Sequence, residues 1–120
     1  MKKFRKAITD EKSRIHVAKV KGKVVGYVYT YKINDTMLFV DNLFVLPEYH
    51  RQGLGKILMA VSLKSFRDAD HRIKNVLVHV RHKNLPAIIF YRKLGFMKIE
   101  EQSEGDYIMY TMLKVLDDFS

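Results

Sequence analysis

The amino-acid sequence predicts an α/β (α+β) fold, a mixed β-sheet with helices packed on it, in the order β-β-β-α-β-α-β-β. Short segments with alternating apolar residues are typical of strands, and two longer stretches carry apolar residues at helical spacing. The first helical stretch lies between two strand-like segments. Strands joined by a helix in this way pair in parallel, which puts a parallel pair at the centre of the sheet. The 120 residues match the size of a single domain, 1–120.

The first part of the chain contains three predicted strands separated by turns. Residues 1–14 form a short basic N-terminal segment that precedes them. Apolar residues alternate from Ile15, and Gly22 indicates a hairpin turn. β-branched residues and tyrosines fill the second strand, which ends at a turn marked by Asn34. The three strands are predicted over residues 15–20, 24–33 and 37–46.

The second part of the chain contains two predicted helices and three predicted strands. After Gly53, apolar residues recur every three or four positions, which predicts the first helix over 54–68. The second helix lies between Asn84, a typical cap that is followed by an early proline, and Gly95, which is typical of a helix end. The remaining strands are predicted over residues 75–81, 96–103 and 106–115, the last two as an antiparallel pair.

The composition excludes several classes of protein. The apolar content of 48% and the charged content of 29% are ordinary for a soluble globular domain. No apolar run is as long as a membrane span, and no apolar segment of a secretory signal follows the basic start, so we expect a cytoplasmic protein with no membrane partner. The absence of cysteine excludes disulfides and any mechanism that needs a protein thiol as nucleophile.

A basic turn with two glycines lies between the third strand and the first helix. Gly53 and Gly55 allow backbone N–H groups to approach a ligand closely, and the start of the helix adds further N–H donors and a positive dipole. Such a turn favours an anion, most simply a phosphate. Leu58 stands where a dinucleotide-binding loop has its third glycine, and Ile57 stands where a Walker A loop has Ser or Thr. The sequence therefore excludes these two phosphate loops.

Two segments carry a resemblance to a known family. His-Arg-Gln-Gly-Leu-Gly at 50–55 resembles the acetyl-coenzyme A pyrophosphate loop of the GNAT superfamily of N-acetyltransferases, with His50 in place of the usual Arg or Gln. Residues 84–96 resemble the family segment Asn-x-x-Ala-x-x-x-Tyr-x-x-x-Gly-Phe at every fixed position. Because both motifs occur in the family's order, the chain resembles a small GNAT member, with a shortened N-terminal region.

The resemblance implies an acetyl-CoA-dependent N-acetyltransferase that transfers acetyl directly from the thioester to a primary amine. It also implies that the central strand separates from its parallel neighbour, so that main-chain groups of the central strand bind the pantetheine arm and one amide serves as the oxyanion donor. The resemblance further implies that the turn holds the diphosphate and that Asn84 bonds the cofactor arm, although Asn84 also fits a cap of the second helix, and both can be true. The implied cofactor-binding residues are Leu43, Phe44, Val45, Arg51, Gln52, Gly53, Leu54, Gly55, Lys56 and Asn84.

Tyr91 and Asp41 are the catalytic residues that the resemblance implies. Tyr91 matches the family tyrosine that faces the sulfur, and a phenol can protonate the departing thiolate. Asp41 lies just before the separation of the strands and is a candidate base, directly or through a water. His79 is the other candidate base, and an amine that arrives deprotonated needs neither. No metal site is predicted, because no carboxylate or thiol accompanies His71, His79 and His82 at ligand spacing.

Other functions and several partners stay open from the sequence. The short N-terminal region and His50 also fit a non-catalytic module that binds coenzyme A. The net charge of +9 and the basic run at residues 2–6 fit a protein associated with nucleic acid or the ribosome, although aromatic residues are not interleaved as in RNA-binding modules. The expected acceptor is a small-molecule amine or a protein or peptide amine. Exposed strand edges favour a homodimer.

Overall fold

The computed structural model describes residues 12–116, which form a mixed sheet and two α-helices. Their order along the chain confirms the predicted arrangement β-β-β-α-β-α-β-β. The strands are β1 (Ser13–Val20), β2 (Lys23–Asn34), β3 (Met37–Val45), β4 (Asn75–Arg81), β5 (Met97–Glu104) and β6 (Tyr107–Val115). The helices are the 3-10 turn η1 (Pro47–Tyr49), α2 (Leu54–Ala69) and α3 (Leu85–Lys93).

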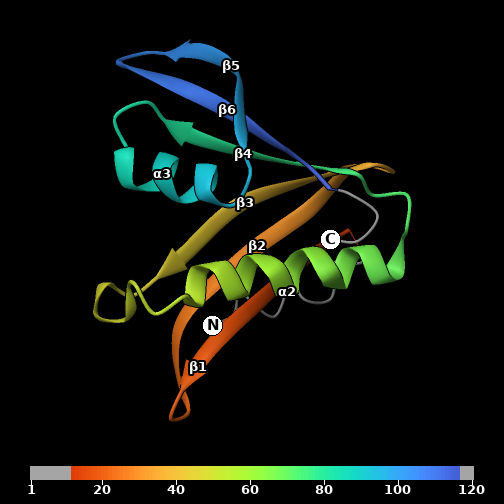
Figure 1. Ribbon diagram of the computed structural model, residues 1–120, viewed down its shortest axis with the longest axis vertical. Coiled ribbons are helices and arrows are strands. Elements are labelled where there is room, and N and C mark those ends of the chain that lie inside the picture. Colours follow the sequence, from red (N-terminus) through yellow and green to blue (C-terminus); the bar gives the residue numbers. More distant parts are fainter. Residues whose placement is uncertain (1–11, 117–120) are drawn as a thin grey trace.

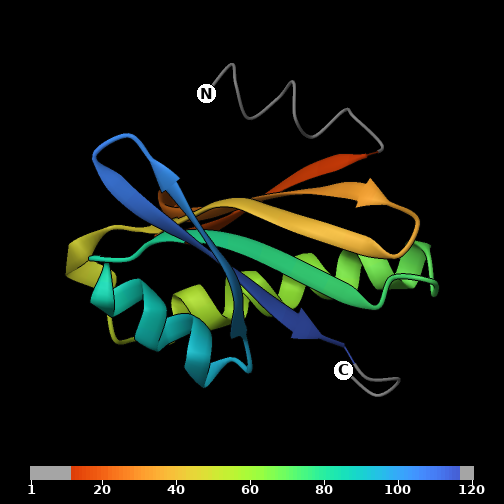
Figure 2. The same ribbon diagram turned by 90° about the horizontal axis from the view of Figure 1, so that it is seen from above.

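The sheet has the strand order β1-β2-β3-β4-β6-β5. Only the central pair, β3 and β4, is parallel, as the sequence predicts for strands that flank a helix. Helices α2 and α3 lie on one face of the sheet, and within the described part of the chain no helix lies on the other face (Figure 2). Neither helix of residues 12–116 is long and apolar enough to cross a membrane.

The core lies between α2 and the sheet. Leu58, Leu63 and Phe66 of α2 are buried, and this apolar stripe packs on β1, β2 and β3 because its residues recur at helical spacing. The buried hydroxyl group of Ser62 donates a 2.8 Å hydrogen bond to that of Thr30, so this polar pair is satisfied inside the core. The sheet contributes a layer of buried apolar residues that includes Val28, Leu38, Val40, Val76, Val78 and Met112.

Strand β1 begins at Ser13, two residues before the predicted start at Ile15 and inside the segment predicted to be polar and basic. The guanidinium group of Arg14 donates a 2.8 Å hydrogen bond to the carbonyl of Ser65 and lies 4.6 Å from the ring centroid of Phe66. These contacts with α2 fix the start of the strand. Alternation of apolar residues within one segment does not reveal them, since they join residues far apart in the sequence.

The parallel pair separates at the carboxyl ends of its strands (Figure 1). Pairing runs from Met37 opposite Asn75 to Val40 opposite Val78 and then stops, although both strands continue. At the same point Asp41 is an extra residue in β3, because the consecutive β2 residues Tyr29 and Thr30 pair with Asn42 and Val40 and leave Asp41 without a partner in that register. A bulge of this kind bends a strand and increases its twist. The bulge at Asp41 thus accompanies the separation that the resemblance implied.

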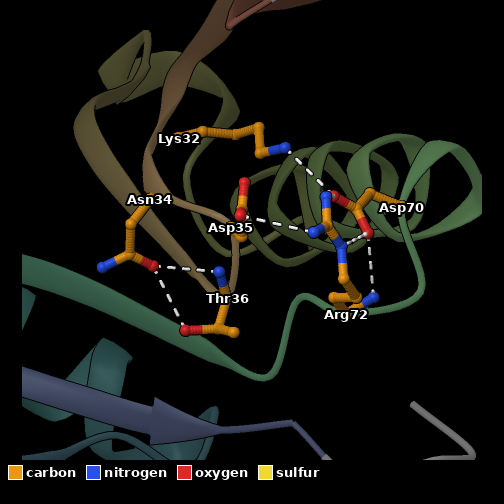
Figure 3. A network of polar contacts seen from close by, with 6 residues as sticks. All are labelled: Lys32, Asn34, Asp35, Thr36, Asp70 and Arg72. Carbon is orange, nitrogen blue, oxygen red and sulfur yellow. Dashed lines mark hydrogen bonds and ion pairs between the residues drawn. The ribbon is translucent and has the colours of Figure 1, made fainter.

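A polar network ties the far end of α2 to the turn between β2 and β3 (Figure 3). The carboxylate of Asp70 accepts hydrogen bonds from Lys32 Nζ at 3.1 Å and from Arg72 Nη2 and Nε at 3.0 Å each. Arg72 also pairs with Asp35 at 3.3 Å, where both side chains are largely exposed. Hydrogen bonds from Arg72, and then from Lys32, hold the pKa of Asp70 well below its usual range.

We expect Asp70→Asn to lower the thermal midpoint at pH 7 by about 3 °C and to reduce acid sensitivity. Because the folded-state pKa of Asp70 is depressed, its stabilisation is complete above the ordinary carboxyl pKa of about 4 and is lost as pH falls through the depressed value. The difference in thermal midpoint between wild type and Asp70→Asn is therefore expected to become smaller below pH 4, as thermal unfolding scans at several pH values would show. Asp35→Asn, an exposed control, has a smaller effect. A gap that is independent of pH would contradict the prediction.

Candidate active site

A cleft of about 650 Å³ lies beside the part of β3 that no longer pairs with β4. One wall is the end of β3, from which Leu43 and Val45 line the cleft. The floor is the turn after η1 together with the first residues of α2, and the opposite wall is one side of α3. The cleft therefore joins the two segments that the sequence singled out, the turn at 50–55 and the helix that follows Asn84.

The turn before α2 has a backbone conformation that few residues adopt. Gly53 precedes the helix with φ of 78°, in the left-handed region that favours glycine. Arg51 has φ of 66° although it is not a glycine. His50 Nε2 donates a 2.7 Å hydrogen bond to the carbonyl of Val45, so the histidine that replaces the family's usual Arg or Gln ties the turn to the end of β3. These features fix the direction in which α2 begins.

Gly55 allows α2 and α3 to approach closely. A Cβ atom at this position would lie 3.2 Å from Cζ of Phe90, closer than ordinary van der Waals contact. Neither Gly53 nor Gly55 therefore puts a side chain between the cleft and the first backbone N–H groups of α2. Those N–H groups have no acceptor inside the helix, and together with the helix dipole they favour an anion at this position.

Tyr91 lines the cleft from α3. Its ring packs edge-on against two aromatic neighbours, with centroids 5.3 Å from Phe90 and 5.4 Å from Phe96. Burial raises the pKa of Tyr91 above its ordinary value because the charged phenolate is poorly solvated there. The hydroxyl group consequently keeps its proton throughout the neutral range and can act as a donor, but not as a base.

The predicted site residues divide into two groups. Eight of them line the cleft: Leu43, Val45, Arg51, Gly53, Leu54, Gly55, Lys56 and Tyr91. Four do not. Phe44 packs against Tyr27 with ring centroids 6.0 Å apart, Gln52 is exposed, and the side chain of Asn84 caps α3 by accepting a 3.3 Å hydrogen bond from the Ala87 N–H group. Asp41 is the bulge residue and is exposed.

The candidate bases lie away from the cleft lining. Burial raises the pKa of Tyr31, and the negative charge of Asp41 adds to this shift, so the carboxylate lies near that phenol. His79 is exposed on β4, and its ring meets Phe39 edge-on at 4.8 Å. Among residues 12–116, no three histidine or carboxylate side chains gather as they would around a metal ion.

Several residues that line the cleft were not predicted as site residues from the sequence. They are Tyr49, His50, Pro86, Ala87, Ile89, Phe90 and Lys93. Four of these, Pro86, Ile89, Phe90 and Lys93, recur along α3 at intervals of three or four residues and so occupy one side of the helix. That periodicity was available in the sequence, but it did not indicate which side of the helix faces the turn.

A six-stranded sheet with a separating parallel pair and a basic turn at the start of the following helix defines a class of cofactor-binding acyltransferase folds. Residues 1–96 match the Acetyltransferase (GNAT) family, and the chain belongs to this family. An N-alpha-acetyltransferase of Sulfurisphaera tokodaii is 31% identical over 81% of the chain and 64% of its own length. An uncharacterised N-acetyltransferase of Mycobacterium bovis is 31% identical over 89% of the chain and 72% of its own length.

Solved structures share the fold. Ard1 from Thermoplasma volcanium has 30% sequence identity and a TM-score of 0.76, and the match covers 83% of this chain and 68% of that one. A PaiA N-acetyltransferase from Thermoplasma acidophilum, solved in complex with coenzyme A, has 21% identity and a TM-score of 0.76. The match covers 87% of this chain and 61% of that one. The similarity to the PaiA structure concerns the fold alone. The chain spans about two thirds of the length of each of these relatives.

Proposed function

We propose that the chain is an acetyl-CoA-dependent N-acetyltransferase that transfers acetyl directly from the thioester to a primary amine. The observation that supports this most is the position of the cleft, beside the end of β3 that no longer pairs with β4, with the start of α2 at its floor and Tyr91 in its wall. Family membership and the coenzyme A bound in a solved relative support the cofactor.

Bound acetyl-CoA supplies an acetyl group activated as a thioester. In the proposal, backbone N–H groups at the start of α2, together with Arg51, hold the diphosphate. The main chain of Leu43 and Val45 aligns the pantetheine arm as an added strand. Tyr91 donates its proton to the sulfur as the amine nitrogen bonds to the carbonyl carbon and the C–S bond breaks. The amine proton leaves to water or to a base.

Neither Asp41 nor His79 lines the cleft, which favours an amine that arrives neutral or loses its proton to water. Asp41, through a bridging water, remains a candidate. The cytoplasmic location and the homodimer expected from the sequence stay predictions, and the basic run at residues 2–6 lies outside the described residues. Strand β5, exposed along its length at one edge of the sheet, supports self-association.

The acceptor class is proposed from the relatives. Archaeal relatives named N-alpha-acetyltransferase match this chain, which favours the α-amino group of a protein or peptide over other amines. Small amino compounds remain alternatives. A panel that contains short peptides with free α-amines, lysine side-chain amines and small amino compounds separates these choices when release of free coenzyme A is measured.

Binding of coenzyme A is the first test. Calorimetric titration at low salt is expected to show one site with a Kd in the micromolar range, which corresponds to a binding free energy of about −8 kcal/mol. Acetyl-CoA then supports release of free coenzyme A with at least one amine of the panel. Absence of binding would overturn the proposed function, and binding without turnover on any amine would favour a non-catalytic coenzyme A module instead.

A further inference from the structure

The cleft carries more positive charge than a diphosphate requires. Arg51, Lys56 and Lys93 line it, and no aspartate or glutamate does. Within residues 12–116 the ion pairs join other side chains, so none of these three cations is neutralised by a carboxylate. Unpaired cations that face one cleft attract anions strongly, because no nearby negative charge offsets their field.

The three cations that line the cleft come from the turn and from both helices. Arg51 lies in the turn that follows η1, beside the N–H groups at the start of α2. Lys56 and Lys93 come from the two helices that meet at Gly55 and Phe90. Lys56 follows Gly55 in α2, and Lys93 lies about one turn after Phe90 in α3. Lys93 is the last residue of α3, a helix that runs away from the sheet toward its carboxyl end (Figure 2).

Coenzyme A carries two separate anionic groups, a diphosphate and a phosphate monoester on the ribose 3′-oxygen. The monoester has a charge between −1 and −2 near neutral pH and three acceptor oxygens, to which lysine binds as a point charge. In the proposed function the diphosphate occupies the start of α2 beside Arg51. Lys56 and Lys93 then remain in the lining of the same cleft as cations for the second anionic group.

We propose that Lys93, together with Lys56, binds the ribose 3′-phosphate of coenzyme A, so that the protein discriminates against the cofactor that lacks this phosphate. The inference rests on the proposed function, because it assumes that coenzyme A occupies the cleft. It goes beyond that function by assigning a phosphate subsite to two helix residues outside the glycine turn.

The test compares the Kd of coenzyme A with that of 3′-dephospho-coenzyme A by calorimetric titration of the full chain. Wild type is expected to bind coenzyme A about tenfold more tightly. In Lys93→Met this ratio falls to about twofold, while the affinity for 3′-dephospho-coenzyme A stays the same. Arg92→Met is the matched control: it removes the same charge from the adjacent exposed position, which does not line the cleft, and it keeps the wild-type ratio.

Further variants and outcomes separate the phosphate subsite from the proposed function. Lys93→Arg, which keeps the charge, is expected to keep a ratio close to that of wild type. Equal affinity of wild type for both compounds would overturn the phosphate subsite and leave the proposed function standing. An equal loss of both affinities in Lys93→Met, or an equal change of the ratio in Arg92→Met, would also overturn it. Failure of wild type to bind either compound would overturn the proposed function together with this inference.

Discussion

Replacing Tyr91 by phenylalanine is expected to lower kcat by about a hundredfold and to change the Kd of coenzyme A by less than about threefold. The substitution removes the hydroxyl group that would protonate the sulfur. It keeps the ring, and therefore the edge-on packing against Phe90 and Phe96 that shapes this wall of the cleft. Steady-state release of free coenzyme A gives kcat, and calorimetric titration gives the affinity.

The pH profile separates a proton donor from a packing residue. A Tyr91 that donates a proton must be in its acid form. Burial raises the pKa of this phenol above its ordinary value of 10.0, so we expect the alkaline decline of wild-type kcat that belongs to it above pH 10. In Tyr91→Phe that decline disappears. An unchanged kcat would exclude Tyr91 as the donor, and a parallel loss of coenzyme A affinity would make it a binding residue.

Gly53→Val is expected to weaken coenzyme A binding by about tenfold or more. The φ of 78° at Gly53 lies in the left-handed region, where an L-residue costs about 1–2 kcal/mol and a β-branched one is a clear outlier. Relief of that strain changes the direction of the turn. The first N–H groups of α2 then no longer point at the place of the diphosphate. Titration with coenzyme A measures the loss.

The chain offers a matched control for this variant. Gly22, in the turn between β1 and β2, has φ of 80°, and a Cβ atom added there meets nothing within 4 Å, as at Gly53. Gly22→Val is therefore expected to lower stability by a similar amount and to leave coenzyme A binding unchanged. If both variants weaken binding equally, the effect is one of stability, and the glycine turn is not the diphosphate site.

The order of elements and most of their limits could be predicted from the sequence, because they depend on local periodicity and on turn residues. Strand β4 lies at the predicted residues, 75–81, and α2 ends one residue beyond its predicted limit. The parallel pair followed from connectivity alone, since a helix between two strands permits it. The glycine turn and Tyr91 were visible as motifs, and both contribute to the cleft.

The side-chain arrangement along β3 could not be predicted. Leu38 and Val40 point into the core, so strict alternation puts Phe44 on that side. The bulge at Asp41 shifts the alternation by one residue, which turns Leu43 and Val45 into the cleft and leaves Phe44 against an aromatic side chain of β2. A bulge depends on how two strands pair, and a single segment does not contain that information.

The roles of His50 and Gly55 were hidden for a similar reason. In the sequence, His50 was a departure from a motif, whereas in the structure it bonds the carbonyl of Val45 and holds the turn. From the sequence, Gly55 was interpreted as a glycine that lets a phosphate approach the backbone. In the structure it also leaves space for the ring of Phe90. Both contacts join residues that only the folded chain brings together.

Pairing between β3 and β4 ends early, so main-chain groups at the centre of the sheet are left without a partner strand. A ligand that binds between the two strands makes contacts that the unfolded chain cannot make. Occupancy and folding are then thermodynamically linked. A ligand at a hundred times its dissociation constant adds about 2.7 kcal/mol to the free energy of unfolding. In a cell, we expect such a protein to resist proteolysis best when the concentration of its small-molecule ligand is high. Its rate of degradation would then depend on that concentration.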